Sequence, residues 1–176
     1  TVAHGRHLPQ SLTGNLEIFL QLAADFGPRM VVFYNGPRCG ASAPDHLHFQ
    51  VAPAGLMPVE QELREPGVRA DGKKRGAAEI WRSKGIGRGV IVIEGGCAAD
   101  VAAAFDEVMR ALRGSVPPAD EPMMNVFCTH SGEGWRLMIF PRLKHRPDAY
   151  EREGEGRLSV SPGAVEMGGV FITHRE

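Results

Sequence analysis

Asp45-His46-Leu47-His48-Phe49-Gln50-Val51 is the stretch from which the fold can be inferred, because polar and apolar side chains alternate along it. Successive side chains of a β-strand point to opposite faces. The two histidines and the glutamine therefore share one face, and the apolar side chains share the other, which we expect to lie in a core. A buried face would have to satisfy all three polar groups, so the pattern predicts a site along a strand edge.

The His-x-His-x-Gln pattern of residues 46–50 resembles the signature of the histidine-triad superfamily, specifically its transferase branch. That branch contains galactose-1-phosphate uridylyltransferases and the ATP adenylyltransferases that phosphorolyse diadenosine tetraphosphate. Histidine-triad hydrolases have a third histidine where this chain has Gln50. The adenylyltransferase group is matched slightly better, by Gly40-Ala41-Ser42 and the Asn35-Gly36 turn and, more loosely, by Phe140-Pro141-Arg142, His145-Arg146-Pro147 and Ser161-Pro162-Gly163-Ala164.

The resemblance implies that His48 attacks the α-phosphorus of a nucleotide and forms a nucleotidyl-histidine intermediate. A neutral imidazole is a good nucleophile near pH 7. His46 would contact phosphate or the backbone around the nucleophile. Gln50 can donate a hydrogen bond to a phosphate oxygen but cannot protonate a leaving group. This favours leaving groups that depart as stable anions, and therefore a ping-pong transferase or phosphorylase whose acceptor bears a phosphate.

Five further residues are candidates for binding the substrate. A strand that ends in Pro-Arg and is followed by Lys, His and Arg gathers cations at its exit, so Arg142 is expected to hold a phosphate and His145 to assist. Asn35, just before the glycine-containing loop, and Ser42 within that loop can donate to the bound phosphate. Gly40 belongs to the same loop, whose glycines would help to position phosphates. No residue is assigned as a metal ligand.

The sequence predicts a single α+β domain over residues 1–176, with a mostly antiparallel sheet and helices packed on it, similar to a histidine-triad domain. Helices are expected at 12–26, capped by Thr13, at 58–65 and at 98–113. Strands are expected at 30–35, 46–52, 77–82, 89–94, 125–129, 135–140 and, weakly, 165–172. Residues 66–76, with Lys73-Lys74-Arg75, are expected to form a mobile loop, and Pro117-Pro118 a turn. No internal repeat is recognisable.

Composition narrows the class of protein. Of 176 residues, 43% are hydrophobic and 23% charged, which is typical of one globular domain. A net charge of −1 gives no reason to expect nucleic acid as a partner. No secretory signal is recognisable, and no apolar run approaches the roughly 18 residues that a membrane span needs. Cys39, Cys97 and Cys128 are scattered and odd in number, which favours reduced thiols and a cytoplasmic location. Residues 1–3 read as the tail of a strand, so we expect further sequence upstream.

The resemblance implies a nucleotide or nucleotide-sugar substrate and a phosphate-bearing acceptor as partners. Related domains often pair, so a homodimer is compatible with the sequence. Some uridylyltransferases with this motif hold zinc, but their cysteine pair has no counterpart here, and no Cys-x-x-Cys spacing occurs. No cofactor is therefore assigned; a divalent metal stays open, with any ligands expected upstream.

Three alternatives remain at this point. A hydrolase would discharge the intermediate to water without a phosphate acceptor. A nucleotide-binding module would bind without forming an adduct; Asp45 favours it, because the family usually passes directly from proline to histidine, and a carboxylate beside His46 could raise the pKa of that imidazole or repel phosphate. A metal-binding protein would use His46 and His48 as ligands.

Overall fold

The computed structural model describes residues 1–114 and 120–172. Eight strands form one open sheet in the order β1-β3-β2-β7-β8-β6-β5-β4, and every neighbouring pair is antiparallel. The fold class is α+β, as the sequence predicts. The strands are β1 (Val2–Ala3), β2 (Met30–Asn35), β3 (His48–Pro53), β4 (Arg69–Arg75), β5 (Ala78–Ser83), β6 (Ile91–Gly95), β7 (Met124–Ser131) and β8 (Gly134–Pro141).

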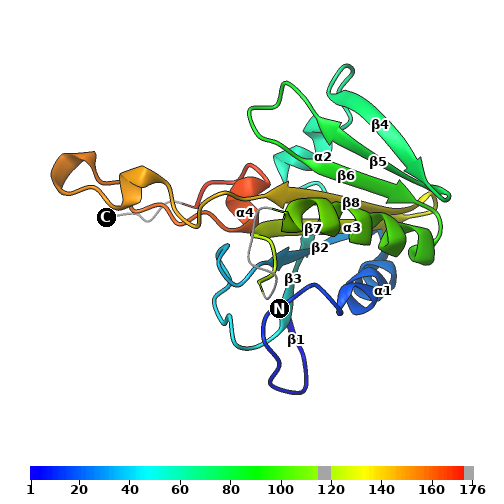
Figure 1. Cartoon of the computed structure of the whole chain (residues 1–176), viewed down its shortest axis with the longest axis horizontal. Coiled ribbons are helices and arrows are strands. Elements are labelled where there is room, and N and C mark those ends of the chain that lie inside the picture. Colours follow the sequence, from blue (N-terminus) through cyan, green and yellow to red (C-terminus); the bar gives the residue numbers. More distant parts are fainter. Residues whose placement is uncertain (115–119, 173–176) are drawn as a thin grey trace.

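Helices cover both faces of the sheet (Figure 1). The long helices α1 (Leu16–Phe26) and α3 (Ala98–Arg113) pack on one face, and the short helices α2 (Pro58–Glu62) and α4 (Ala164–Met167) pack on the other. Alternation along the strands divides their apolar side chains between two cores, as in β2, where Val32 faces α1 and Phe33 faces α4. Single 3₁₀ turns occur at Gly27–Arg29, Asp148–Tyr150 and Gly154–Gly156. Among the described residues, no helix is both long and apolar enough to cross a membrane.

Most of the predicted elements are confirmed, but α1 begins later than expected. Its N-cap is Asn15 and not Thr13, and the Thr13 backbone N–H donates to Glu121 Oε1 at 2.8 Å. The same carboxylate oxygen accepts from the backbone N–H of Leu12, also at 2.8 Å. This distant acceptor holds residues 12 and 13 outside the helix, which sequence periodicity could not reveal. The turn expected at Pro117-Pro118 lies outside the described residues.

The loop expected at residues 66–76 is wrong, because Arg69–Arg75 form the edge strand β4, paired with β5. Two of its cations have acidic partners, although their side chains stay exposed: Arg69 contacts Glu79, and Lys73 contacts Glu107 of α3. A charged, exposed edge strand also resists pairing with other chains. The strand expected at 165–172 is wrong as well. Residues 164–167 form helix α4, whose start is capped when Gly163 N–H donates to Glu166 Oε2 at 2.8 Å.

The structure contains an internal repeat that inspection of the sequence does not reveal. Two units share one element order, β1-α1-β2-β3-α2 and β6-α3-β7-β8-α4, and in each the first strand pairs with the last. The units meet where β2 pairs antiparallel with β7, with Phe33 opposite Phe127. Antiparallel pairing of equivalent strands is what a local twofold axis produces. The strands that meet share only a Met-x-Val-Phe pattern, at 30–33 and 124–127, which explains why the repeat goes unnoticed.

Candidate active site on strands β2 and β3

His48 opens β3 and is 7% exposed, on the sheet face that carries α2 and α4. Its Nδ1 lies 2.8 Å from the carbonyl oxygen of His46. A carbonyl oxygen can only accept, so Nδ1 carries the proton and donates. In the neutral ring Nε2 then has the free lone pair. The local geometry therefore prepares one defined nitrogen of His48 for nucleophilic or metal chemistry.

His46 lies in the loop before β3 rather than on the strand. Its Nε2 donates to the carbonyl oxygen of His4 at 2.8 Å, and its ring packs edge-on against His7 at a centroid distance of 4.9 Å. Asp45 turns away from His46, and its carboxylate lies 3.3 Å from His7 Nε2, with both side chains largely exposed. Such an exposed pair contributes little stability. The carboxylate expected to act on His46 therefore contacts a different imidazole.

Gln50 ends a chain of polar side chains that crosses four strands. Asn35 Nδ2 of β2 donates to Gln50 Oε1 at 2.9 Å, and Asn125 Nδ2 of β7 donates to Asn35 Oδ1 at 2.8 Å. Arg142, directly after β8, donates from Nη1 to Asn125 Oδ1 at 2.8 Å. The sequence singled out Gln50, Asn35 and Arg142, but it missed Asn125, which is fully buried and links them.

Two backbone groups fix the orientation of the amide side chains in this hydrogen-bonded chain, because a backbone N–H can only donate and a carbonyl oxygen can only accept. The backbone N–H of Ala164 donates to Asn35 Oδ1 at 2.6 Å, and the carbonyl of Cys39 accepts from Asn125 Nδ2 at 2.7 Å. Both amides are thereby oriented without ambiguity. Asn35 must present its NH₂ group to Gln50, so Gln50 accepts with Oε1. Gln50 Nε2 is left without a hydrogen bond to any described residue, and it can donate to a ligand.

Gln10 ties the two strands together and was also missed. Its Nε2 donates to the carbonyls of Asn35 at 2.9 Å and His48 at 3.1 Å, and its Oε1 accepts from His48 N–H at 2.9 Å. The side chain is 3% exposed, and all three of these bonds go to backbone groups. It replaces ladder hydrogen bonds where β2 and β3 separate around the loop at 36–47. A lone glutamine in a loop carries no sequence pattern that could have predicted this.

The loop candidates differ in their surroundings. Gly40 has φ = +93°, and a Cβ there would lie 2.7 Å from the Cα of Gly163. Only glycine allows this contact between the two loops, so Gly40 brings residues 161–164 against the site. Ser42 is exposed and makes no hydrogen bond to any described residue. The structure therefore joins Gly40 to the site, whereas among the described residues it shows no hydrogen bond between Ser42 and the site.

Arg142 is occupied by protein acceptors. Besides Asn125, its Nη1 donates to the carbonyl of Pro162 at 3.0 Å, and its Nη2 donates to the carbonyls of Lys144 at 3.3 Å and His145 at 3.0 Å. These bonds hold the chain after β8, and a phosphate would compete with them. Partial burial, and then the charges of Arg146 and Arg142, lower the pKa of His145 and so favour its neutral form. Phosphate binding by either residue stays a prediction.

The three cysteines are unpaired thiols. Burial raises the pKa of Cys39 to about 11 and raises that of Cys128 further, so neither is a thiolate near pH 7. Cys97 is exposed. Within residues 1–114 and 120–172, no group of three or more His, Cys, Asp or Glu side chains is arranged to hold a metal ion.

Comparison with known proteins supports the fold and assigns no activity. Residues 1–53, which include the His-x-His-x-Gln stretch, match a family model described as a domain of unknown function, DUF4922. The chain is similar to the crystal structure of a DUF4931 family protein from Bacillus cereus, with a TM-score of 0.52 and 16% sequence identity. The alignment covers 89% of this chain and 74% of that chain. At this identity the likeness concerns the fold alone. A search of curated proteins gives no match.

Proposed function

We propose that this protein is a histidine-triad-like nucleotidyltransferase or phosphorylase that acts through a covalent nucleotidyl-histidine on His48. His48 Nε2 attacks the α-phosphorus of a nucleotide or nucleotide sugar, an N–P bond forms, and the bridging P–O bond breaks. The leaving group departs as a phosphate anion with the electron pair. A phosphate oxygen of the acceptor then attacks the same phosphorus, forms a new P–O bond and releases His48.

One observation carries this proposal: the Nδ1–H of His48 donates to the His46 carbonyl at 2.8 Å. The bond fixes the tautomer in which Nε2 is nucleophilic, and it holds the ring in one orientation. When Nε2 is phosphorylated, the same carbonyl faces the positive charge that develops on the ring and stabilises it.

Gln50 supports transfer in preference to hydrolysis. Its amide is held by Asn35 with Nε2 outward, so it can donate to a non-bridging phosphate oxygen. The amide has no acidic proton that it could transfer to a leaving alkoxide. This suits leaving groups that depart as phosphate anions. The motif resemblance and the α+β likeness to the Bacillus cereus protein support the histidine-triad-like assignment, although that protein's name states no activity.

Intact-protein mass spectrometry tests the proposal directly. The protein is incubated separately with ATP, diadenosine tetraphosphate, UDP-glucose and GDP-mannose, without added phosphate. We expect a mass gain of one nucleoside monophosphate with at least one donor, and the loss of this gain in His48→Gln. His4→Gln is the matched control. In the part of the chain that the structure describes, the His4 side chain bonds only to the Arg6 backbone, and the His4 carbonyl that accepts from His46 is retained in the variant.

The outcomes separate the alternatives. Discharge of the adduct by a phosphate-bearing acceptor supports a transferase, whereas equal discharge by water identifies a hydrolase. Saturable nucleotide binding without any adduct identifies a binding module and overturns the proposal. An adduct that persists in His48→Gln would place the nucleophile elsewhere.

A further inference from the structure

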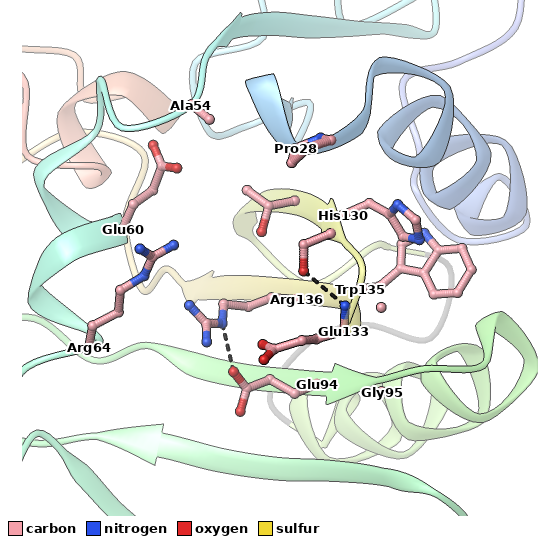
Figure 2. Close-up of a pocket in the computed structure, with 13 residues that line it drawn as sticks. Pro28, Ala54, Glu60, Arg64, Glu94, Gly95, His130, Glu133, Trp135 and Arg136 are labelled. Atoms are coloured by element: carbon pink, nitrogen blue, oxygen red, sulfur yellow. Dashed lines mark hydrogen bonds and ion pairs between the residues drawn. The ribbon is translucent and has the colours of Figure 1, made fainter.

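A second polar cavity lies on the same sheet face, at the opposite end of the strands. It has a volume of about 640 Å³ and lies between α2 and the turn that joins β7 to β8 (Figure 2). Ala54, which follows β3, contributes to its wall. His48 is six residues before Ala54 on an extended chain, so the two places are about 20 Å apart. The charged and hydroxyl side chains that line the cavity include Glu60, Arg64, Glu94, Thr129, Glu133 and Arg136.

The internal repeat makes this cavity the counterpart of the candidate active site. Phe33 faces Phe127 at the centre, and the registers of β2 with β3 and of β7 with β8 then equate residues of the two units. Asn35 corresponds to Thr129, His48 to Arg136, and Gln50 to Met138. The second unit thus has an arginine where the first has its proposed nucleophile.

The cavity is open because the network of the first site has no equivalent here. At the first site α4 begins with Ala164, whose N–H donates to Asn35. In the other unit α2 begins with Pro58, which has no N–H to donate. Asn125 and Arg142, which belong to the second unit, complete the first site. Their counterparts in the first unit are Val31 and Ala54, whose apolar side chains cannot form such a chain of hydrogen bonds at the cavity.

Some charged side chains in the cavity are hydrogen-bonded to protein groups, and others are not. Glu60 accepts from the backbone N–H groups of Gly55 at 3.0 Å and Met57 at 3.3 Å, and thereby caps α2. Glu94 accepts from Arg136 Nε at 2.6 Å and from Trp81 Nε1 at 2.8 Å. Both carboxylates are therefore satisfied by protein donors.

Two arginine side chains and one carboxylate in the cavity have hydrogen-bonding groups without a partner among the described residues. Arg136 uses only Nε, so both of its Nη groups lack a partner among the described residues, and the Arg64 side chain lacks one altogether. Figure 2 shows both guanidinium groups reaching into the cavity. Glu133 is exposed there, and its carboxylate makes no hydrogen bond to the described residues.

We propose that this cavity binds a small organic phosphate that carries hydroxyl groups. Arg64 and the Nη groups of Arg136 hold the phosphate, because two guanidinium forks match its oxygens. Glu133 accepts from a hydroxyl group of the same ligand. This site is independent of nucleotidyl transfer at His48.

Isothermal titration calorimetry with ribose 5-phosphate tests this site, with ribose, inorganic phosphate and malonate as comparison probes. We expect ribose 5-phosphate to bind most tightly, inorganic phosphate more weakly, and ribose and malonate not measurably. Arg64→Gln should weaken binding of ribose 5-phosphate at least about tenfold. Because Arg64 is exposed and has no partner among residues 1–114 and 120–172, this variant should fold normally. Arg110→Gln, an exposed arginine on α3 across the sheet, should bind like the wild type.

The test separates the two sites of the molecule. His48→Gln should bind ribose 5-phosphate like the wild type, whether or not His48 forms an adduct. Binding that persists in Arg64→Gln and disappears in His48→Gln would overturn the proposal and place the ligand at the histidine. Malonate that binds as tightly as ribose 5-phosphate would overturn the phosphate assignment. A shift of the Thr129 backbone amide resonance on titration, absent in Arg64→Gln, would support the proposed position.

Discussion

The two ends of the β2–β7 pair are surrounded by equivalent elements, but one end is filled by hydrogen-bonded side chains and the other holds a cavity. At the histidine end, Asn35, Asn125 and Arg142 form a closed chain of hydrogen bonds beneath α4. At the other end the equivalent positions hold Thr129, Val31 and Ala54, and a cavity remains beneath α2. The shared framework of strands and helices supplies only the positions of the side chains. Whether an end becomes a fixed hydrogen-bonded arrangement or an open pocket depends on a few polar side chains and on one backbone N–H.

Asn125→Leu should have the largest effect on stability, because it removes the buried side chain that links Asn35 to Arg142 at the histidine end. Leucine is similar in size but leaves Arg142 Nη1, Asn35 Oδ1 and the Cys39 carbonyl each without one partner. Orphaned groups of this kind cost about 1–3 kcal/mol each, partly offset where other bonds remain, so we expect a loss of about 2–4 kcal/mol. Urea unfolding followed by circular dichroism measures it.

Thr129→Val at the open end is the matched control for Asn125→Leu. Its hydroxyl makes no hydrogen bond to the described residues, so we expect a change within about 0.5 kcal/mol. Equal losses in the two variants would show that the polar chain does not stabilise its end of the sheet.

Asn35→Asp should affect the proposed chemistry more than the fold. A carboxylate cannot donate, so Gln50 must turn its Nε2 toward residue 35 and present Oε1 to the substrate. Loss of a donor to a reacting phosphate lowers rates by about 100–1,000-fold, and we expect this fall in the rate of adduct formation. Rapid-quench sampling with mass detection measures that rate.

A double-mutant cycle isolates the orientation of Gln50 from the added charge. If Asn35 acts through Gln50, then Gln50→Ala should slow adduct formation by a similar factor, and the double variant should be little slower than either single variant. Fully multiplied losses would show instead that the new carboxylate repels the substrate independently of Gln50.

The sequence predicted the strands and helices that follow from local alternation and periodicity. It missed the features that depend on contacts between residues far apart in the chain. The strand with His48 and Gln50, its antiparallel partner at 30–35 and the two amphipathic helices follow from local patterns. Asn125 lies in a strand that was expected, but nothing in its neighbourhood shows that it faces Asn35. Such a contact depends on the β2–β7 register, which joins residues 90 positions apart. Edge strand β4 was missed for a related reason, since its cations pair with residues of β5 and α3.

Thiol reactivity gives the smallest effect and compares the two ends without an activity assay. Cys39 lies in the loop at the closed end, fully buried and with its pKa raised to about 11, whereas Cys97 is exposed two residues after Gly95 of the open cavity. The thiolate is the reactive form, so a raised pKa slows labelling at neutral pH, and labelling accelerates as the pH rises toward 11. With 5,5′-dithiobis(2-nitrobenzoate) at pH 7.5, we expect one fast thiol, Cys97, and two slow ones. Asn125→Leu should accelerate Cys39 selectively, because the Cys39 carbonyl then loses its hydrogen bond. Labelling of Cys39 at the rate of Cys97 in the wild type would show that the histidine end is as open as the cavity, and that the network does not close it.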